Sequence, residues 1–335
     1  KLEGTDLDLS SLTFNSTVDV QNPYVVAGTV TNTGLNSIQS FDVSWTIGSN
    51  VYTTNFNSLS ISSLGTYNFS HPDLLTLNTS GLHTLEVVIS NVNGLTNDFN
   101  SANDNLSMQI EAVDYATFGN RDYIYYHASS ALPNCPLVLV FHGYSGTAQD
   151  IMDYSQFNAL AEEFGFAVCY PQGTLDGSNT TFFNVGYDFQ TNQTVDDVVF
   201  VEDLVDSLQS MYSLSEQDVF STGMSNGGDF SYMLACEASE TFKAVAPVAG
   251  MIMQDIMDNC NPVNEVSILE IHGTQDNVTY WQGDPNNNDG WGAYPSIPNT
   301  INFFTNMFGL TELIPTVFPD IDPNDGSTEN SDKYS

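Results

Sequence analysis

Basic residues are almost absent from this sequence. Its 335 residues include 4 Lys and Arg against 41 Asp and Glu, which gives a formal net charge of −37. A surface with this charge repels nucleic-acid phosphates and anionic lipid headgroups, so nucleic acids and membranes are excluded as partners. Such a charge is best tolerated where salt screens it, which suits a saline habitat, although an acidic exported protein without salt adaptation fits equally well.

Long apolar runs are also missing. No segment approaches the roughly 18 apolar residues of a membrane-spanning helix. The chain begins with Lys1-Leu2-Glu3-Gly4, which lacks the basic-then-apolar pattern of a signal peptide. We predict a secreted, extracellular protein, and we expect its signal peptide to have been removed already.

The four cysteines form no C-x-x-C or other metal-ligand spacing, so the sequence predicts no zinc site. Cys169 lies in an apolar, strand-like run and is expected to be a buried free thiol. A disulfide closing the loop between Cys236 and Cys260 would be compatible with an oxidising compartment. Cys135 has no evident partner.

Residues 1–112 have the pattern of a small all-β sandwich. Residues 41–47 alternate apolar and polar side chains with a period of two, as expected of a half-buried strand. A Gly-Ser-Asn turn leads from there into a return strand at 51–54. Further strands are predicted at 25–30 and 85–89, and no helix-length periodic segment occurs. The segments TVTNTG, SFDVSWTIG, YNFSHP, HTLEVVISNVNG and NDNLSMQIEA resemble the Ig-like, cell-adhesion-related modules of exported bacterial enzymes, which implies an accessory domain.

In residues 119–335 strands alternate with helices, which predicts a mostly parallel sheet with crossover helices. Residues 137–141 form a continuous apolar run, as in a strand buried on both faces. Further strands are predicted at 166–170, 218–222, 244–248 and 267–271, and helices at 157–164, 198–212 and 230–236. We therefore expect a doubly wound α/β domain.

The sequence G-M-S-N-G at 223–227 matches the G-x-S-x-G pattern. The pentapeptide alone is a weak signal, and an ordinary glycine-rich turn with a solvated serine is the alternative. A predicted strand precedes it and a predicted helix follows it, which is the arrangement of a nucleophile elbow in an α/β-hydrolase. We therefore predict that Ser225 is a catalytic nucleophile.

The loop after the first predicted core strand begins with His142. In α/β-hydrolases this loop and the residue after the nucleophile each supply a backbone N–H to the oxyanion hole. We assign these donors to the amides of Tyr144 and Asn226. His142 precedes the nucleophile, so we expect its ring to have a structural role rather than to act as the base.

Asp276 follows the strand predicted at 267–271. A carboxylate at the carboxyl end of a parallel strand is placed where it can orient a catalytic imidazole. The alternative is a loop Asp in an Asx turn. His272 lies beside the strand before the acid, and we expect it to be packed at the strand end.

No histidine follows Asp276 in this sequence, although the base of an α/β-hydrolase comes after its acid. The chain contains only His71, His83, His127, His142 and His272. The last part of the sequence is loop-like around 323–327, without the final strand and helix of this fold. We therefore expect that the 119–335 domain is incomplete at its C-terminus and that the base lies beyond Ser335.

The second domain contains the segments PLVLVFHGYSGTAQD, FNALAEEFGFAVCYPQG, VDDVVFVEDLVDSLQSMYSLSEQDVFSTGMSNGG, FKAVAPVAG and ILEIHGTQDNVTYW. These segments closely resemble those of polyhydroxybutyrate depolymerases, feruloyl esterases and carbohydrate esterase family one. The resemblance covers about residues 119–325, and the final histidine segment of that family is absent. It implies Ser225 as nucleophile, Asp276 as acid, oxyanion donors at Tyr144 and Asn226, and a Cys236–Cys260 disulfide. It also suggests Trp281 beside the acyl or alcohol pocket, where a plain packing role is equally compatible.

These observations predict a serine carboxylester hydrolase that forms an acyl-enzyme and needs no metal or organic cofactor. The expected substrates are polymer-linked esters, either feruloyl or acetyl groups on polysaccharide or polyhydroxyalkanoate-type polyesters. Two alternatives stay open: a non-catalytic binding or adhesion protein that keeps the hydrolase fold, and a serine peptidase on the same fold. The sequence does not predict the acyl group or the oligomeric state.

Overall fold

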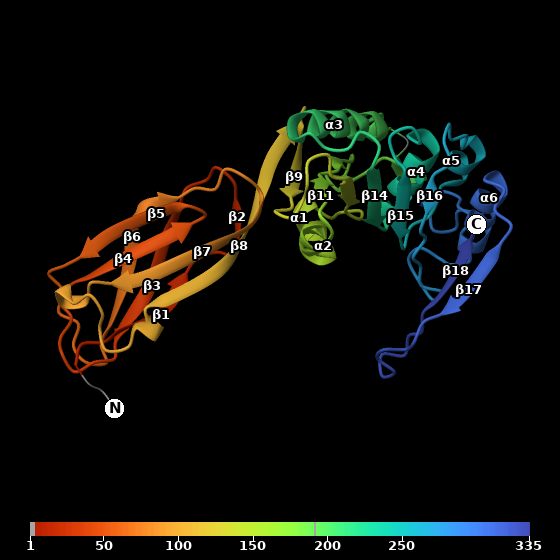
Figure 1. Cartoon of the computed structure of the whole chain (residues 1–335). Helices are drawn as coiled ribbons and strands as arrows, with labels where there is room; N and C mark the ends of the chain where they lie inside the picture. The colour runs from red at the N-terminus through yellow and green to blue at the C-terminus, as the bar shows by residue number, and fades with distance from the viewer. Residues whose placement is uncertain (1–3, 191) are drawn as a thin grey trace. The chain divides into compact units, whose positions relative to one another are not determined.

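The computed structural model describes residues 4–190 and 192–335, and the chain divides into two compact units (Figure 1). The first unit comprises Lys1–Cys135 and Ser155–Cys169, and the second comprises Pro136–Tyr154 and Tyr170–Ser335. No helix of the described residues is both long and apolar enough to cross a membrane.

The first unit contains two antiparallel sheets that form a sandwich. One sheet has the order β1-β3-β6, and the other has the order β5-β4-β7-β8, with the short β2 parallel to β8. The strands are β1 (Leu7–Thr13), β2 (Thr17–Asp19), β3 (Tyr24–Asn32), β4 (Phe41–Ile47), β5 (Asn50–Phe56), β6 (Thr66–Leu75), β7 (Gly81–Ser90) and β8 (Asn105–Phe118). The four strands predicted from the sequence are confirmed.

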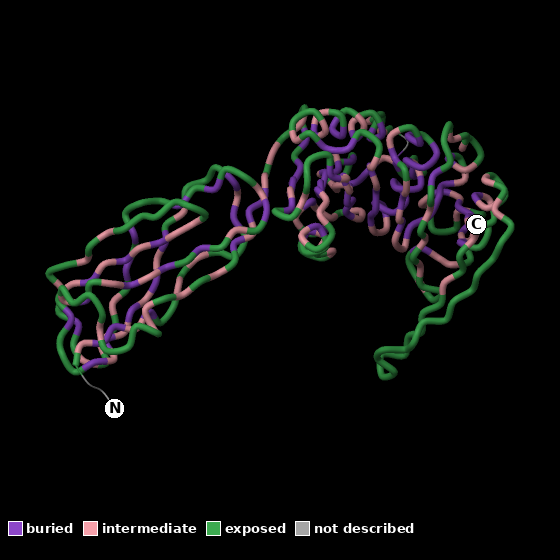
Figure 2. The backbone as a smooth tube through the Cα atoms, in the orientation of Figure 1, coloured by how far each residue is buried: buried purple, intermediate pink, exposed green. Residues whose placement is uncertain are grey.

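Alternation along β4 builds the core between the two sheets. Phe41, Val43 and Trp45 are fully buried, while the residues between them are half-buried. Phe69 on β6 and Leu85 on β7 belong to the same buried cluster, so one core holds both sheets together (Figure 2). The short 3-10 helices η1 (Val92–Gly94) and η2 (Ser101–Asn103) lie in the connection between β7 and β8.

The rest of the first unit follows the sandwich in sequence. The second part of β8 pairs antiparallel with β9 (Arg121–His127). Helix α2 (Phe157–Phe164) has the predicted bounds and ends at Gly165, whose φ of 76° suits a left-handed C-cap. Strand β11 (Ala167–Pro171) carries Cys169, which is buried and free as expected; Cys135 is also buried and free.

A parallel sheet forms the centre of the second unit, with the order β16-β15-β14-β10. Its strands are β10 (Leu137–Phe141), β14 (Val219–Met224), β15 (Ala244–Val248) and β16 (Ser267–Ile268). The register places Phe141 opposite Gly223 and Met224 opposite Val248. The predicted mostly parallel sheet is confirmed. Strand β16 is shorter than predicted, although an isolated bridge joins Val248 and Ile271 farther along.

The helices of the second unit are α1 (Ala148–Ser155), α3 (Asp197–Tyr212), α4 (Asn226–Glu237), α5 (Gln254–Asn259) and α6 (Ile297–Met307). Asp196 caps α3 through the Val199 N–H at 3.0 Å. Helix α4 packs on β10, β14 and β15 and begins four residues earlier than predicted. The sequence did not predict α1, α5 or α6, because these helices are short or lie in segments without a long periodic pattern.

Three irregular regions complete the second unit. They contain the β12 (Thr174–Leu175) and β13 (Thr181–Phe182) hairpin, η3 (Asp188–Gln190), and an antiparallel hairpin of β17 (Leu313–Val317) and β18 (Asn330–Tyr334). The loop expected around 323–327 lies between β17 and β18. Most of this last hairpin is solvent-exposed (Figure 2).

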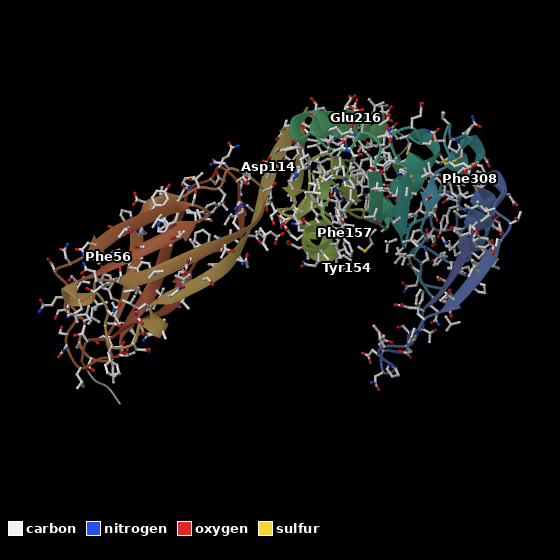
Figure 3. All side chains as sticks on the ribbon, in the orientation of Figure 1. Phe56, Asp114, Tyr154, Phe157, Glu216 and Phe308 are labelled. Carbon is white, nitrogen blue, oxygen red and sulfur yellow. A yellow bond between two sulfur atoms is a disulfide. The ribbon has the colours of Figure 1, made fainter. Side chains whose placement is uncertain are left out.

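A disulfide joins Cys236, near the end of α4, to Cys260, directly after α5. Figure 3 draws it as a yellow bond within the second unit. The pairing that the family resemblance implied is therefore present in the structure.

Candidate active site

Ser225 lies at the turn between β14 and α4, with φ 54° and ψ −121°. A non-glycine residue with positive φ is strained, and such strain is typical of a reacting side chain held on a sharp turn. The Ser225 N–H donates to the Val248 carbonyl at 2.9 Å, and the Ser225 carbonyl accepts from the Asp229 N–H at 2.9 Å. The predicted strand–turn–helix geometry of an α/β-hydrolase elbow is therefore present.

The glycines around Ser225 are required by contact with other backbone segments. A Cβ at Gly227 would lie 2.3 Å from the Phe141 carbonyl oxygen, and one at Gly223 would lie 2.5 Å from Gly227. A Cβ at Gly228 would lie 3.0 Å from the Val248 carbonyl oxygen. Since neighbouring backbone does not yield, only glycine lets the first turn of α4 sit against β10.

The parallel strands bring the predicted site residues to one edge of the sheet. Tyr144 follows β10, Ser225 follows β14, and Asp276 follows β16, so all three leave the carboxyl ends of strands in the same sheet. Strand β15 separates β14 from β16, which sets those two strands about 10 Å apart. This is the edge where ligand sites of α/β sheets form.

The backbone N–H groups of Tyr144 and Asn226 are the predicted oxyanion donors, which must not be used by other hydrogen bonds. Within the described residues, neither N–H donates to another group of the chain. Asn226 is fully buried, and its side chain is held by Phe183: Oδ1 accepts from the Phe183 N–H at 2.7 Å, and Nδ2 donates to the Phe183 carbonyl at 2.9 Å. These bonds fix the position of the helix start without using its backbone N–H.

Tyr144 is fixed by its phenol. Its hydroxyl donates to Asp176 Oδ2 at 2.6 Å, and Gln190 Nε2 donates to the same oxygen at 2.9 Å. Asp176 Oδ1 accepts from the backbone N–H groups of Ser178 and Thr180. The Tyr144 hydroxyl, together with the backbone and Gln190 donors, outweighs desolvation and lowers the Asp176 pKa to about 2. The segment from Asp176 to Gln190 thus holds both predicted oxyanion donors.

Asp229 lies one turn into α4 and is buried. Its Oδ2 accepts a short hydrogen bond from the Tyr187 hydroxyl, and its Oδ1 accepts from the Met251 N–H at 2.6 Å. Tyr187 in turn accepts from Asn226 Nδ2 at 3.1 Å. Burial raises the Asp229 pKa to about 7 in spite of these donors. Sequence reasoning missed this group, because the hydrogen bond to Tyr187 spans 42 residues.

Asp276 has one carboxylate oxygen in a local turn and one directed toward a ring. Oδ1 accepts from the N–H groups of Val278 and Thr279 at 2.8 and 3.0 Å. Oδ2 lies 3.8 Å from His272 Nε2. The Asx-turn interpretation therefore describes Oδ1, while Oδ2 stays compatible with the predicted role as acid.

The two histidines of this unit are both engaged in structural contacts. His142 Nε2 accepts from the Gly173 N–H at 2.9 Å, while Nδ1 lies 2.7 Å from the Gly143 carbonyl; burial lowers its pKa. His272 lies between Glu270 at 2.9 Å and the Thr279 carbonyl at 2.8 Å. Burial of the His272 ring opposes protonation, but these hydrogen bonds outweigh it and raise its pKa. Both rings thus have both nitrogens in contact with other groups of the protein, and His71, His83 and His127 belong to the first unit.

An aromatic group surrounds the Tyr144 ring. It consists of Tyr144, Tyr187, Phe189 and Trp291, with centroids 5.1–5.9 Å apart in five ring pairs. Phe189 is 49% exposed, so the group offers an apolar surface next to a predicted oxyanion donor. The ring of Trp281, which the family resemblance suggested as a pocket residue, lies 6.1 Å from the His272 ring. The only sequence signal for Trp291 is a tryptophan in an Asn- and Gly-rich loop.

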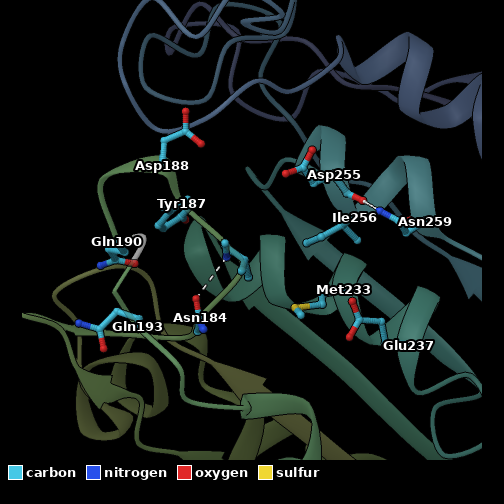
Figure 4. A pocket seen from close by; sticks show the side chains of 12 residues that line it. Asn184, Tyr187, Asp188, Gln190, Gln193, Met233, Glu237, Asp255, Ile256 and Asn259 are labelled. Carbon is cyan, nitrogen blue, oxygen red and sulfur yellow. Dashed lines mark hydrogen bonds between the residues drawn. The ribbon is translucent and has the colours of Figure 1, made fainter.

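A cavity of about 490 Å³ lies between the 184–193 segment and helices α4 and α5 (Figure 4). Asn184, Gln190 and Gln193 line one side, and Glu237 and Asp255 line the other. None of the predicted catalytic residues lines it. The cavity touches the aromatic group through Tyr187.

Residues 121–281 match the family model described as Esterase PHB depolymerase. The bifunctional acetylxylan esterase/xylanase XynS20E of Neocallimastix patriciarum is 27% identical over 162 residues, which cover 48% of this chain and 22% of that protein. The putative esterase NocK of Nocardia uniformis subsp. tsuyamanensis is 30% identical over 47% of this chain and 46% of its own length. Feruloyl esterase B of Piromyces equi is 29% identical over 44% of this chain and 27% of its own length. The chain therefore spans less than half the length of these relatives.

The contact between Gly227 and β10 gives a direct test of the elbow. We expect Gly227→Ala to destabilise the second unit by about 1–3 kcal/mol, because the added methyl overpacks backbone that cannot move away. Gly273→Ala is the matched control, since its Cβ would meet no atom closer than 3.9 Å. Urea unfolding of both variants measures the difference; equal stabilities would show that the close packing at Gly227 is not required.

Burial of Asp229 predicts a pH dependence of stability. Its folded-state pKa of about 7 exceeds the roughly 3.9 of an unfolded Asp. The stabilisation from the protonated form is therefore complete below about pH 4 and is lost as the pH rises through about 7. We expect the free energy of unfolding of the wild type to fall relative to that of Asp229→Asn across this range, by at most about 1.4 kcal/mol per pH unit. Denaturant unfolding at a series of pH values measures this, and parallel curves would contradict it.

Proposed function

We propose that this chain, whose residues 121–281 form a domain of the esterase PHB depolymerase family, hydrolyses carboxylic esters with Ser225 as the nucleophile. The strained Ser225 turn at the carboxyl edge of the sheet is the observation that carries this proposal. It is supported by the backbone N–H groups of Tyr144 and Asn226, which follow β10 and begin α4 and which donate to no other group among the described residues.

The proposed reaction has two acyl-transfer steps. The Ser225 oxygen adds to the ester carbonyl while its proton passes to a general base, and the Tyr144 and Asn226 amides stabilise the resulting oxyanion. Collapse expels the alcohol, which takes up that proton, and leaves an acyl-enzyme. Water then adds to the acyl carbon by the same route and releases the acid and the free serine.

Asp276 is proposed as the acid that orients the base. Its Oδ1 is fixed by two backbone donors, which leaves Oδ2 to accept from an imidazole. We assign the base to none of the five histidines. Those of the second unit are held at both ring nitrogens, and the others lie in the first unit.

The proposed substrates are ester groups carried on an extracellular polymer. The names of the acetylxylan and feruloyl esterase relatives support acetyl or feruloyl esters. We propose that the protein is secreted. We also propose the two domains predicted from the sequence, an Ig-like accessory domain at 1–112 and a hydrolase domain at 119–335. The aromatic group supports substrates with a ring or a long apolar part, because its exposed Phe189 face adjoins Tyr144.

Replacement of the nucleophile tests the proposed reaction. With the intact natural protein, we expect Ser225→Ala to lower kcat/KM for p-nitrophenyl acetate by at least about 10⁴-fold, because no other group forms the acyl-enzyme. Ser231→Ala, which removes a hydroxyl bonded to the Gly227 carbonyl in the same helix, is the matched control.

Two results would contradict the proposal. Full activity in Ser225→Ala would show that another residue acts as nucleophile. A folded natural protein that hydrolyses no ester would favour a binding role, and faster cleavage of a matched amide than of the ester would favour a peptidase.

The aromatic group predicts substrate preference. We expect Trp291→Ala to lower kcat/KM for methyl ferulate relative to p-nitrophenyl acetate by about fivefold, because an aromatic contact of this kind contributes about 1 kcal/mol beyond its buried area. Trp281→Ala is the matched comparison. A larger loss in Trp281→Ala than in Trp291→Ala would assign the pocket to Trp281, as the family resemblance suggested.

A further inference from the structure

The His272 imidazole has a hydrogen-bond acceptor at each of its two ring nitrogens. Nδ1 lies 2.9 Å from Glu270 Oε1, and Nε2 lies 2.8 Å from the Thr279 carbonyl oxygen. The His272 side chain has no exposed surface, and that of Glu270 is only 6% exposed. A neutral imidazole has one N–H and one acceptor nitrogen, whereas an imidazolium has two N–H groups. A carboxylate on one side and a carbonyl on the other therefore fit the imidazolium.

A second donor holds Glu270 in place. The Tyr232 hydroxyl donates to Glu270 Oε2, which is the oxygen that does not bond the ring. Burial, together with the negative charges of Glu270 and Asp229, raises the pKa of Tyr232 well above its usual value, so this hydroxyl keeps its proton. Both oxygens of the buried Glu270 carboxylate thus have a donor, and the imidazolium supplies the opposite charge that a buried carboxylate needs.

The other side of the His272 ring contacts the turn that carries the proposed acid. Thr279 accepts from His272 through its carbonyl and donates through its N–H to Asp276 Oδ1 at 3.0 Å. Asp276 Oδ2, the oxygen left for the base, lies 3.8 Å from His272 Nε2. His272 therefore fixes the end of this turn through a hydrogen bond and places its charge beside the carboxylate at the start of the turn.

These contacts form a continuous path from the helix of the nucleophile to the acid. Helix α4 begins directly after Ser225 and carries Tyr232, whose hydroxyl leads through Glu270 and His272 to the Asp276 turn. Strand β15 lies between β14, which precedes the nucleophile, and β16, which precedes the acid. The path therefore connects the two proposed catalytic groups although their strands do not pair with each other.

The charged groups that interact with the ring all have the sign that stabilises an imidazolium. Glu270 and Asp276 flank it on its own segment, and Asp229 interacts with it from α4. Burial of the ring opposes protonation, but the hydrogen bonds to Glu270 and Thr279, with the charges of Glu270 and Asp276, outweigh burial and raise the His272 pKa. The electrostatic surroundings thus agree with the arrangement of the acceptors.

We propose that His272, as an imidazolium paired with Glu270, is a positioning residue that holds Asp276 in place relative to Ser225. The inference rests on the proposed function, in which Asp276 orients the base. His272 transfers no proton in that reaction; it fixes the turn and keeps a positive charge beside the acid. A displacement of about 1 Å can lower a rate about 100-fold, so the position of the acid matters as much as its presence.

The protonation of the ring is tested by NMR of the whole chain with ¹⁵N-labelled histidine at about pH 7.5, where a histidine with the ordinary pKa of about 6.5 is mostly neutral. We expect two ring N–H protons on His272 and one on His142, whose Nε2 accepts from the Gly173 N–H and so carries no proton. The signals lost in His272→Gln assign the ring. In Glu270→Gln we expect His272 to lose its Nδ1 proton, because the amide then donates to that nitrogen.

Ester hydrolysis by the intact natural protein tests the positioning role. We expect His272→Gln to lower kcat for p-nitrophenyl acetate by about 10- to 100-fold and to change KM less than about twofold, because the ring contacts the acid rather than the substrate. Ser239→Ala is the matched control. It removes a buried hydroxyl that accepts from the Val263 and Asn264 N–H groups, away from this path, and should leave kcat unchanged.

Three outcomes would overturn the inference. One is a single ring proton on His272 in the wild type, which would place the shared proton on Glu270. Another is an equal loss of kcat in His272→Gln and Ser239→Ala, which would reduce the role of His272 to stability. The third is a change in KM alone. Failure of the proposed function is seen separately, as full activity of Ser225→Ala, and the NMR result does not depend on ester hydrolysis.

Discussion

The close packing of the first turn of α4 against β10 is the constraint on which the rest of the second unit depends. A Cβ at Gly227 would lie 2.3 Å from the Phe141 carbonyl oxygen, so no side chain fits there. That approach places the Ser225 turn beside the loop that carries Tyr144, so a serine and an amide 81 residues apart in sequence reach the same edge of the sheet. The positive φ of Ser225 is the conformational cost of this arrangement.

A single segment, from Asp176 to Gln190, then fixes the proposed oxyanion hole. Asp176 holds the Tyr144 phenol, while Phe183 and Tyr187 hold the Asn226 side chain. Oxyanion donors are effective when they are already in place before charge develops, because no reorganisation is then needed during the reaction. The segment holds the side chains of both donor residues, while their backbone N–H groups make no hydrogen bond within the described part of the chain. The proposed donors are therefore held in place and stay available to an oxyanion.

The sequence predicts best what depends on local pattern. The apolar run at 137–141 and the alternation at 41–47 have the observed strand bounds, and the glycine spacing around Ser225 correctly predicts a strand–turn–helix. It predicts poorly what depends on contacts between distant segments. The Tyr187–Asp229 bond and the ring contact between Tyr144 and Trp291 join residues that are 42 and 147 positions apart. Periodicity contains no information about such pairs, because each partner alone is an ordinary loop or helix residue.

Because basic residues are scarce, buried carboxylates of this chain are stabilised by neutral hydrogen-bond donors or by protonation. Lys243 pairs with Asp218 at 2.7 Å, but a chain with 4 Lys and Arg cannot pair 41 acids in this way. Asp176 stays charged because neutral hydroxyl, amide and backbone donors surround it, which lowers its pKa to about 2. Asp229 has fewer donors and is more deeply buried, so its pKa rises to about 7 and a proton neutralises it near neutral pH.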